Sequence, residues 1–265
     1  MARAAAGDNT AAGEQPSDGP DGRIIDGLGP RATELLLFLA VHPGGAGRDY
    51  LVATLWPDTA GDRPSGPFYN LLARIRRTMQ TATGSHDLDE LIVRTGDKYR
   101  LNLDLVATDY TTFLHAATDI NHPDPTVRAR ACETVIHTYR GALGREHTSS
   151  EWLLELQLNA RYRYLCALTS LAQLTLDTDP DRTLGLLETA RLHEPTNEDI
   201  YRSIMTIHDH QHRPDAALNT YALLQAHLDN LDNTLTPEPA TTALALPIRD
   251  THTQQLRRTP SARSA

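Results

Sequence analysis

Apolar residues recur at helical spacing in three segments near the start of the chain. Residues 31–43 (RATELLLFLAVHP) and 48–57 (RDYLVATLWP) each place apolar side chains on one face and end at a proline. A third helix is predicted from Pro67 to Gln80. Its apolar stripe consists of Phe68, Leu71, Leu72, Ile75 and Met79. The pattern therefore predicts three helices between residues 31 and 80.

A strand-like pair follows these helices. Residues 91–95 (LIVRT) and 98–102 (KYRLN) flank Gly96-Asp97, a dipeptide that suits a tight hairpin turn. Three helices followed by a hairpin is the element order of a winged helix-turn-helix domain. Beyond residue 105 the pattern predicts helices and no sheet.

The second half of the chain contains an internal repeat. Pro180-Asp181, Leu184, Leu187 and His193 recur 34 residues later as Pro214-Asp215, Leu218, Tyr221 and His227. A period of this length is typical of tetratricopeptide repeats, in which helix pairs stack because neither helix buries its apolar face alone. The predicted pairs are 153–177 with 181–193 and 197–211 with 215–231, preceded by helices near 108–119 and 125–140. Such stacks bind protein partners or self-associate.

These patterns predict a mainly α fold, a winged helix-turn-helix domain followed by an all-α repeat domain. The expected boundaries are a disordered segment at 1–22, the winged helix at 23–104, the helical domain at 105–246 and a disordered tail at 247–265.

Composition narrows the function classes. The 265 residues contain two cysteines, Cys132 and Cys166, which cannot form a disulfide framework, so a cytoplasmic location is expected. The longest apolar run, residues 35–41, is too short to span a bilayer. No phosphate-binding or catalytic motif appears, so we expect no enzyme, no cofactor and no small-molecule substrate.

Charge is distributed unevenly along the chain. The formal net charge is −9, yet residues 63–100 hold seven basic and four acidic side chains. Arginines on the exposed face of the third helix can contact phosphates or pair with guanine edges, and those near the hairpin can meet the DNA backbone. The candidate DNA-binding residues are Arg63, Tyr69, Asn70, Ala73, Arg74, Arg76, Arg77, Arg94, Lys98 and Arg100. An ordinary solvated helix face is the alternative interpretation.

Other conspicuous residues have structural interpretations. In HDHQH only His208 and His212 share a helix face and no third ligand is evident nearby, which favours a solvated helix end over a metal site. The two cysteines are expected to pack as small apolar groups. Trp56 and Trp152 are expected to be deeply buried among apolar helix positions.

The order of several motifs resembles that of a known family. LLLFLAVHPGG, LVATLWPD, NLLARIRRTM, KYRLNLD, TDYTTFLHAA and YRGAL occur in the order and spacing of Streptomyces antibiotic regulatory proteins. The resemblance covers residues 28–246. It implies an OmpR-like winged helix joined to a bacterial transcriptional activator domain, with Tyr69, Asn70, Ala73, Arg74 and Arg77 facing DNA.

The same resemblance has two further implications. OmpR-like domains open with a small antiparallel sheet, for which only Arg23–Asp26 could supply a strand here. The segment GLGPRATELLLFLAVHPGG also resembles relatives in which this domain pair ends a membrane-anchored polypeptide. The expected function is a transcriptional regulator that binds double-stranded DNA, with repeats that dimerise or contact RNA polymerase or another protein. A protein-interaction adaptor whose winged helix does not read DNA is the alternative.

Overall fold

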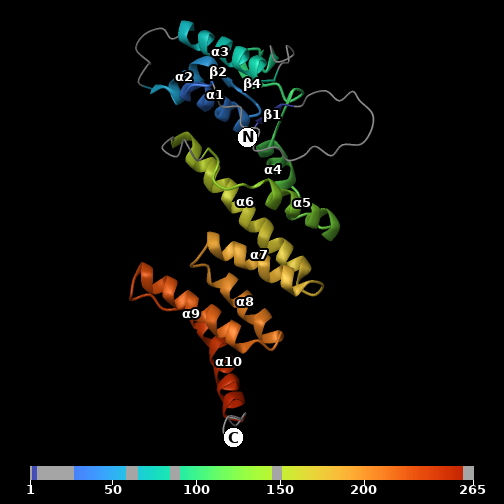
Figure 1. The fold of residues 1–265 in the computed structure, drawn as a ribbon, viewed down its shortest axis with the longest axis vertical. Helices are drawn as coiled ribbons and strands as arrows, with labels where there is room; N and C mark the ends of the chain where they lie inside the picture. The colour runs from blue at the N-terminus through green and yellow to red at the C-terminus, as the bar shows by residue number, and fades with distance from the viewer. Residues whose placement is uncertain (1, 5–26, 58–64, 84–89, 145–150, 259–265) are drawn as a thin grey trace. The chain divides into compact units, whose positions relative to one another are not determined.

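The computed structural model describes residues 2–4, 27–57, 65–83, 90–144 and 151–258. The chain forms two compact units (Figure 1). Unit 1 consists of residues 1–116 and 137–161, and unit 2 consists of residues 117–136 and 162–265. Residues 137–161 therefore belong to unit 1, although they lie within the range 105–246 that was expected to form the helical domain.

Three helices form the centre of unit 1, as the apolar periodicity predicted. They are α1 (Pro30–Val41), α2 (Arg48–Leu55) and α3 (Ser65–Thr83). Their buried side chains share one core, which includes Ala32, Leu35, Phe38, Leu39, Leu51, Leu55, Phe68, Leu72 and Ile75. Because α3 packs through one apolar stripe, its opposite face stays free for another role.

The predicted hairpin is also present. It consists of β3 (Ile92–Thr95) and β4 (Lys98–Leu101), paired antiparallel. Gly96 lies in the turn with φ of +64°, a left-handed conformation that glycine adopts at little cost. The buried side chains of Ile92 and Leu101 attach the hairpin to the core of unit 1.

A short third strand joins this hairpin to the start of α2. β2 (Ala46–Gly47) pairs antiparallel with β4, so Ala46 lies opposite Tyr99 and Gly47 lies opposite Lys98. Arg48 follows Gly47 directly as the first residue of α2. The strand order β2-β4-β3 therefore brings the first turn of α2 beside the hairpin.

A second antiparallel pair corrects two expectations. β1 (Ala2–Ala4) pairs with β5 (Val106–Thr108), although residues 2–4 were expected to be disordered and no sheet was expected beyond residue 105. Val106 and Thr108 are buried on one side of β5. β5 has only three residues, which is too few for an alternating pattern of apolar and polar side chains to be recognised in the sequence. Its partner β1 lies about 100 residues earlier in the chain. The strand expected at Arg23–Asp26 falls outside the described residues.

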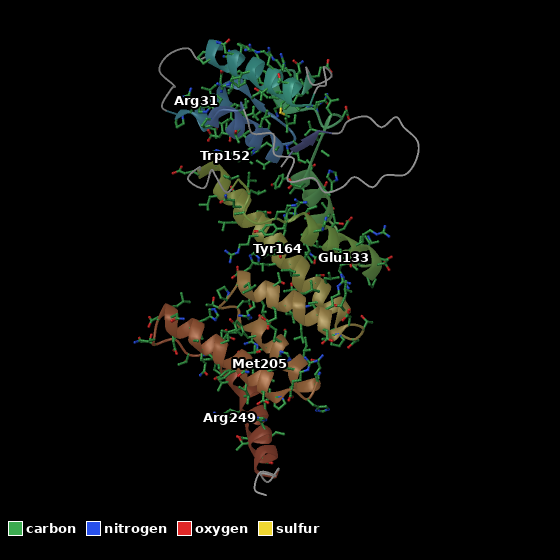
Figure 2. All side chains as sticks on the ribbon, viewed as in Figure 1. Arg31, Glu133, Trp152, Tyr164, Met205 and Arg249 are labelled. Carbon is green, nitrogen blue, oxygen red and sulfur yellow. The ribbon has the colours of Figure 1, made fainter. Side chains whose placement is uncertain are left out.

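Two more helices contribute to unit 1. They are α4 (Asp109–Ala117), except for its last residue, and the start of α6 (Glu151–Thr175). Figure 2 labels Trp152, whose ring centroid lies 5.0 Å from that of Phe38. Gly144 precedes α6 at φ of +56°, and a Cβ there would come within 2.9 Å of the fully buried Leu153. Residues of the predicted helical domain are thus part of the winged-helix core.

The expectation of deeply buried tryptophans is wrong. Both Trp56 and Trp152 are only partly buried, at the margin of the core. The guanidinium of Arg31 lies 5.8 Å from the ring centroid of Trp56. The indole Nε1 of both residues is shielded from solvent, so the exposed part of each tryptophan lies elsewhere on the residue.

Unit 2 is a succession of helices with the predicted repeat. Its helices besides the end of α6 are α5 (Pro125–Thr138), α7 (Pro180–His193), α8 (Glu198–His210), α9 (Pro214–Leu231) and α10 (Pro239–Arg258). Proline occupies the first position of α7 and of α9, where its missing N–H costs no helical hydrogen bond. The fold class is confirmed, helices occupy the four ranges expected to form the pairs, and α8 packs on α9 as expected.

Helix α10 corrects the expectation of a disordered tail from residue 247. Ala245 and Ile248 are buried against Met205 of α8 (labelled in Figure 2) and Ala217 of α9. Pro247 lies inside α10 and suggested a helix end, because proline removes one backbone donor. Burial of an apolar face on α8 and α9 offsets that loss, so the helix continues to residue 258.

Candidate nucleic-acid interface

The two faces of α3 differ in chemistry. Phe68, Leu71, Leu72 and Ile75 are buried, and Phe68 and Ile75 retain at most 1% of their surface exposed. The opposite face exposes the side chains of Tyr69, Asn70, Ala73, Arg74 and Arg77. Exposed residues can therefore be replaced without opening a cavity in the core. The helical period places all five predicted face residues outside, as expected for a helix that presents one side to a groove.

The three arginines of α3 have different surroundings. A Cβ built on Gly29, just before α1, would lie 3.3 Å from an Nη of Arg74, so this guanidinium lies beside the start of α1. The Nε of Arg77 donates a long bond of 3.4 Å to the carbonyl of Ala73. Arg76 is half-buried, with its Nε away from solvent. Arg74 and Arg77 are thus more available to an outside anion than Arg76 is.

The hairpin carries further cations. Arg94 donates from Nε to the carbonyl of Gly96 at 3.0 Å, and its guanidinium carbon lies 5.9 Å from the ring centroid of Tyr99. Lys98 is exposed, and Arg100 donates from Nε to the hydroxyl of Thr95 at 3.4 Å. These bonds hold the arginines along the hairpin. Arg63 lies outside the described residues.

Arg48 belongs to the same surface, although sequence reasoning missed it. Its side chain is 39% exposed and pairs with Asp49, with 2.8 Å between Nη2 and Oδ1. The pKa of Arg48 is raised, chiefly by its hydrogen bond to Asp49 and to a smaller degree by one to Tyr69. An isolated Arg-Asp pair at a helix start gives no periodic signal. Only the pairing of β2 with β4 brings it next to the hairpin.

Tyr69 also has partners that its sequence position did not reveal. The pKa of Tyr69 is lowered, chiefly because its hydroxyl accepts a hydrogen bond from Tyr99, and also by the hydrogen bond and charge of Arg48. The pKa of Tyr99 is raised, chiefly by burial. The two phenols lie against the same ring, since Phe68 is 5.9 Å from Tyr69 and 5.1 Å from Tyr99 between centroids. Tyr69 is therefore engaged with the hairpin as well as exposed.

Unit 2 offers a different surface. A shallow cleft of about 460 Å³ lies between α5, α6 and α7, and it combines apolar side chains such as Leu171 with the ion pair of Arg182 and Glu133. In the described parts of the chain, no three His, Cys, Asp or Glu side chains gather as metal ligands would. None of the described helices is both long and apolar enough to cross a membrane.

The chain combines a winged helix with stacked helix pairs, which is a two-part architecture. A profile of the bacterial transcriptional activator domain family matches residues 108–249, which is more than half of the chain. The chain belongs to this family, whose members are regulators of transcription rather than enzymes. The family expected from the motif order is confirmed. No curated protein sequence matches the chain.

The fold is also similar to a solved structure. This is Mycobacterium tuberculosis EmbR in complex with a low-affinity phosphopeptide, with a TM-score of 0.58 and 18% sequence identity. The match covers 84% of this chain and 60% of the EmbR chain. This chain therefore matches less than two thirds of that protein, and the likeness shows the fold alone.

Proposed function

We propose that this protein binds double-stranded DNA through α3 and the β3–β4 hairpin and regulates transcription. The observation that carries the proposal is the division of α3 into a buried apolar stripe and an exposed face with Arg74 and Arg77. A helix held in this way can enter a major groove while its scaffold stays outside. Arginine suits both contacts needed there, because its guanidinium binds phosphates and pairs bidentately with guanine.

The hairpin and unit 2 complete the proposal. Lys98 and Arg94 on the hairpin supply positive charge for backbone phosphates next to the groove. Unit 2 supplies the protein contacts, with RNA polymerase, another protein or a second copy of the chain as partner. Its cleft fits this role because it joins an apolar floor to charged side chains, as protein interfaces do.

The test is duplex binding by a variant that carries both Arg74→Ala and Arg77→Ala. Because phosphate contacts release counterions, each lost contact should lower the slope of log affinity against log salt by about one, and a lost base contact should cost about 1–3 kcal/mol. Fluorescence anisotropy with labelled duplexes over a salt series measures both quantities. Operators for this assay can be selected by DNA pulldown with the full chain.

Two controls separate binding from folding and from net charge. Arg130→Ala with Arg249→Ala removes the same charge from exposed positions of unit 2 and should leave the slope unchanged. Leu72→Ala should instead lower the stability of unit 1 by about 2–5 kcal/mol, because it truncates a packed core residue. If the wild-type chain retains no duplex even at low salt, the proposal is wrong and the adaptor function replaces it.

A further inference from the structure

Helix α6 carries apolar side chains on two sides. Its inner side packs against the rest of the chain, and Leu153 and Ala160 there retain at most 4% of their surface exposed. Its outer side carries Leu154, Leu158 and Tyr162, which are 57%, 58% and 68% exposed. Packing of the chain on itself therefore accounts for the inner side and leaves the outer side unexplained.

The three outer residues form one continuous row. They follow one another at intervals of four residues, so each lies about 6 Å further along the helix and is turned by about 40°. All three belong to one helix, so its geometry alone fixes their arrangement. Single apolar residues are common on protein surfaces, whereas contiguous apolar surface marks a binding site. We call Leu154, Leu158 and Tyr162 the outer stripe.

Charge is divided between the two halves of this part of α6. The acidic residues Glu151 and Glu155 precede Leu158 and are exposed. The basic residues Arg161 and Arg163 follow it and are half-buried. The helix dipole favours an acidic residue such as Glu151 in the first turn, but it does not account for the arginines, which lie about three turns before the helix ends.

A second copy of α6 is complementary to this surface when it runs antiparallel. A twofold axis beside Leu158 places this residue on its own copy, and it places Leu154 next to Tyr162 of the second copy. The same rotation brings the acidic half of one helix to the basic half of the other. A parallel pair would instead bring like charges together, so the charges favour the antiparallel arrangement.

We propose that the outer stripe is the interface of a homodimer in which two copies of α6 pair antiparallel about Leu158. Glu155 directly follows Leu154 and Arg163 directly follows Tyr162, so both charged residues lie on the same flank of the stripe. Antiparallel pairing therefore brings Glu155 of each copy to Arg163 of the other, as a charged rim beside an apolar centre. Because the stripe is short, the dimer should be weak and depend on concentration.

This inference goes beyond the proposed function. It involves neither α3 nor the β3–β4 hairpin, so a failure of DNA binding and a failure of the dimer are distinguishable. It also identifies the kind of partner that this surface fits, which is a second copy of the chain.

Sedimentation equilibrium of the full chain over a concentration series tests the dimer. Leu154→Gln combined with Leu158→Gln removes apolar surface at unchanged charge and should raise the dimer Kd at least about tenfold. Leu192→Gln combined with Leu231→Gln is the matched control, because these leucines are 74% and 67% exposed on α7 and α9, and it should leave the Kd unchanged. All four positions are exposed, so every variant should keep the circular dichroism of the wild type.

A charge exchange tests the orientation of the two helices. Glu155→Arg should raise the Kd by about tenfold, because each dimer contains the pair with Arg163 twice. Arg163→Glu alone should have a similar effect. The variant that combines both changes restores opposite charges across the interface and should return the Kd close to that of the wild type.

Three results would overturn the inference. A wild-type chain that stays monomeric at its highest soluble concentration would leave the outer stripe to a different partner. An equal Kd for the wild type and the variant of Leu154 and Leu158 would place the dimer interface elsewhere. If the charge-exchanged variant dimerises no better than Glu155→Arg alone, the two helices do not pair antiparallel.

Discussion

Unit 1 is closed by segments that are distant in sequence, whereas unit 2 stacks each helix on the next. In unit 1, β1 pairs with β5 and Trp152 packs on Phe38. In unit 2, α7 packs on α8, α8 on α9, and α10 on both α9 and α8, so every one of these contacts joins helices that are close in sequence. A nearest-neighbour stack can lose its last helix and keep the others folded, but a core closed by a distant segment is exposed when that segment is removed. We therefore expect unit 1 to unfold as a whole when a distant segment is lost, and unit 2 to tolerate the loss of its last helix.

Truncation should break unit 1 most severely. A chain that ends at Asp104 lacks β5, α4 and the residues Trp152 and Leu153, of which Leu153 is fully buried. We expect this fragment to show no cooperative thermal transition, because the core beside Phe38 is left open to water. Circular dichroism melts of this fragment and of a chain that ends at Leu235 provide the comparison.

The second truncation removes only α10 from the end of unit 2. It exposes Met205 and Ala217 and should lower the stability of unit 2 while leaving the transition of unit 1 intact. If the fragment that ends at Asp104 melts as cooperatively as unit 1 of the full chain, the distant segments are not needed and the comparison between the units fails.

A glycine-to-alanine substitution should lower the stability of unit 1 at one position and raise the stability of unit 2 at another. At Gly144, φ is +56° and a new Cβ would lie 2.5 Å from Leu37 and 2.9 Å from Leu153, so Gly144→Ala should destabilise unit 1 by about 1–3 kcal/mol. At Gly185, inside α7, a new Cβ meets nothing within 4 Å. Gly185→Ala should stabilise unit 2 by about 0.5–1 kcal/mol, because alanine favours the helix.

Urea unfolding of both glycine variants measures this difference. Unit 1 can be followed by tryptophan fluorescence, since Trp56 and Trp152 both lie in it and the chain contains only two tryptophans. Equal effects of the two substitutions would mean that the close contact at Gly144 relaxes at no cost.

The comparison also explains what could be predicted from the sequence. The helix pairs of unit 2 were predictable because a 34-residue repeat records the contact of each helix with its neighbour. The buried face of α3 was predictable for a similar reason, since Phe68, Leu72 and Ile75 follow the helical period. Elements that bury a periodic apolar face can therefore be predicted individually from the local sequence.

Contacts between distant elements left no such signal. Arg48 lies next to the hairpin only because Gly47 pairs with Lys98, and a two-residue strand has no pattern to recognise. The pairing of β1 with β5 and the position of Trp152 depend on long-range packing in the same way. The tail from residue 247 appeared to break at Pro247, and only its burial against α8 and α9 shows why the helix continues.

Acid should destabilise unit 2 slightly through His208. Burial lowers the pKa of His208 below its ordinary value, and the positive charge of Arg213 adds to this shift, while Glu188 opposes it. Below about pH 6.5 the unfolded chain takes up a proton at His208 that the folded chain resists, so stability falls as the pH falls. The slope should stay below about 1.4 kcal/mol per pH unit, the value for one whole proton.

His208→Gln removes the titrating group and should flatten this part of the pH profile. His210→Gln is the control, because His210 is exposed on the same helix and its replacement should leave the slope in place. Urea midpoints of unit 2 between neutral and mildly acidic pH give the measurement. An equal slope in the His208 variant and the wild type would assign the acid sensitivity to other groups. A slope that instead appeared in the tryptophan signal would assign it to unit 1, because both tryptophans lie there.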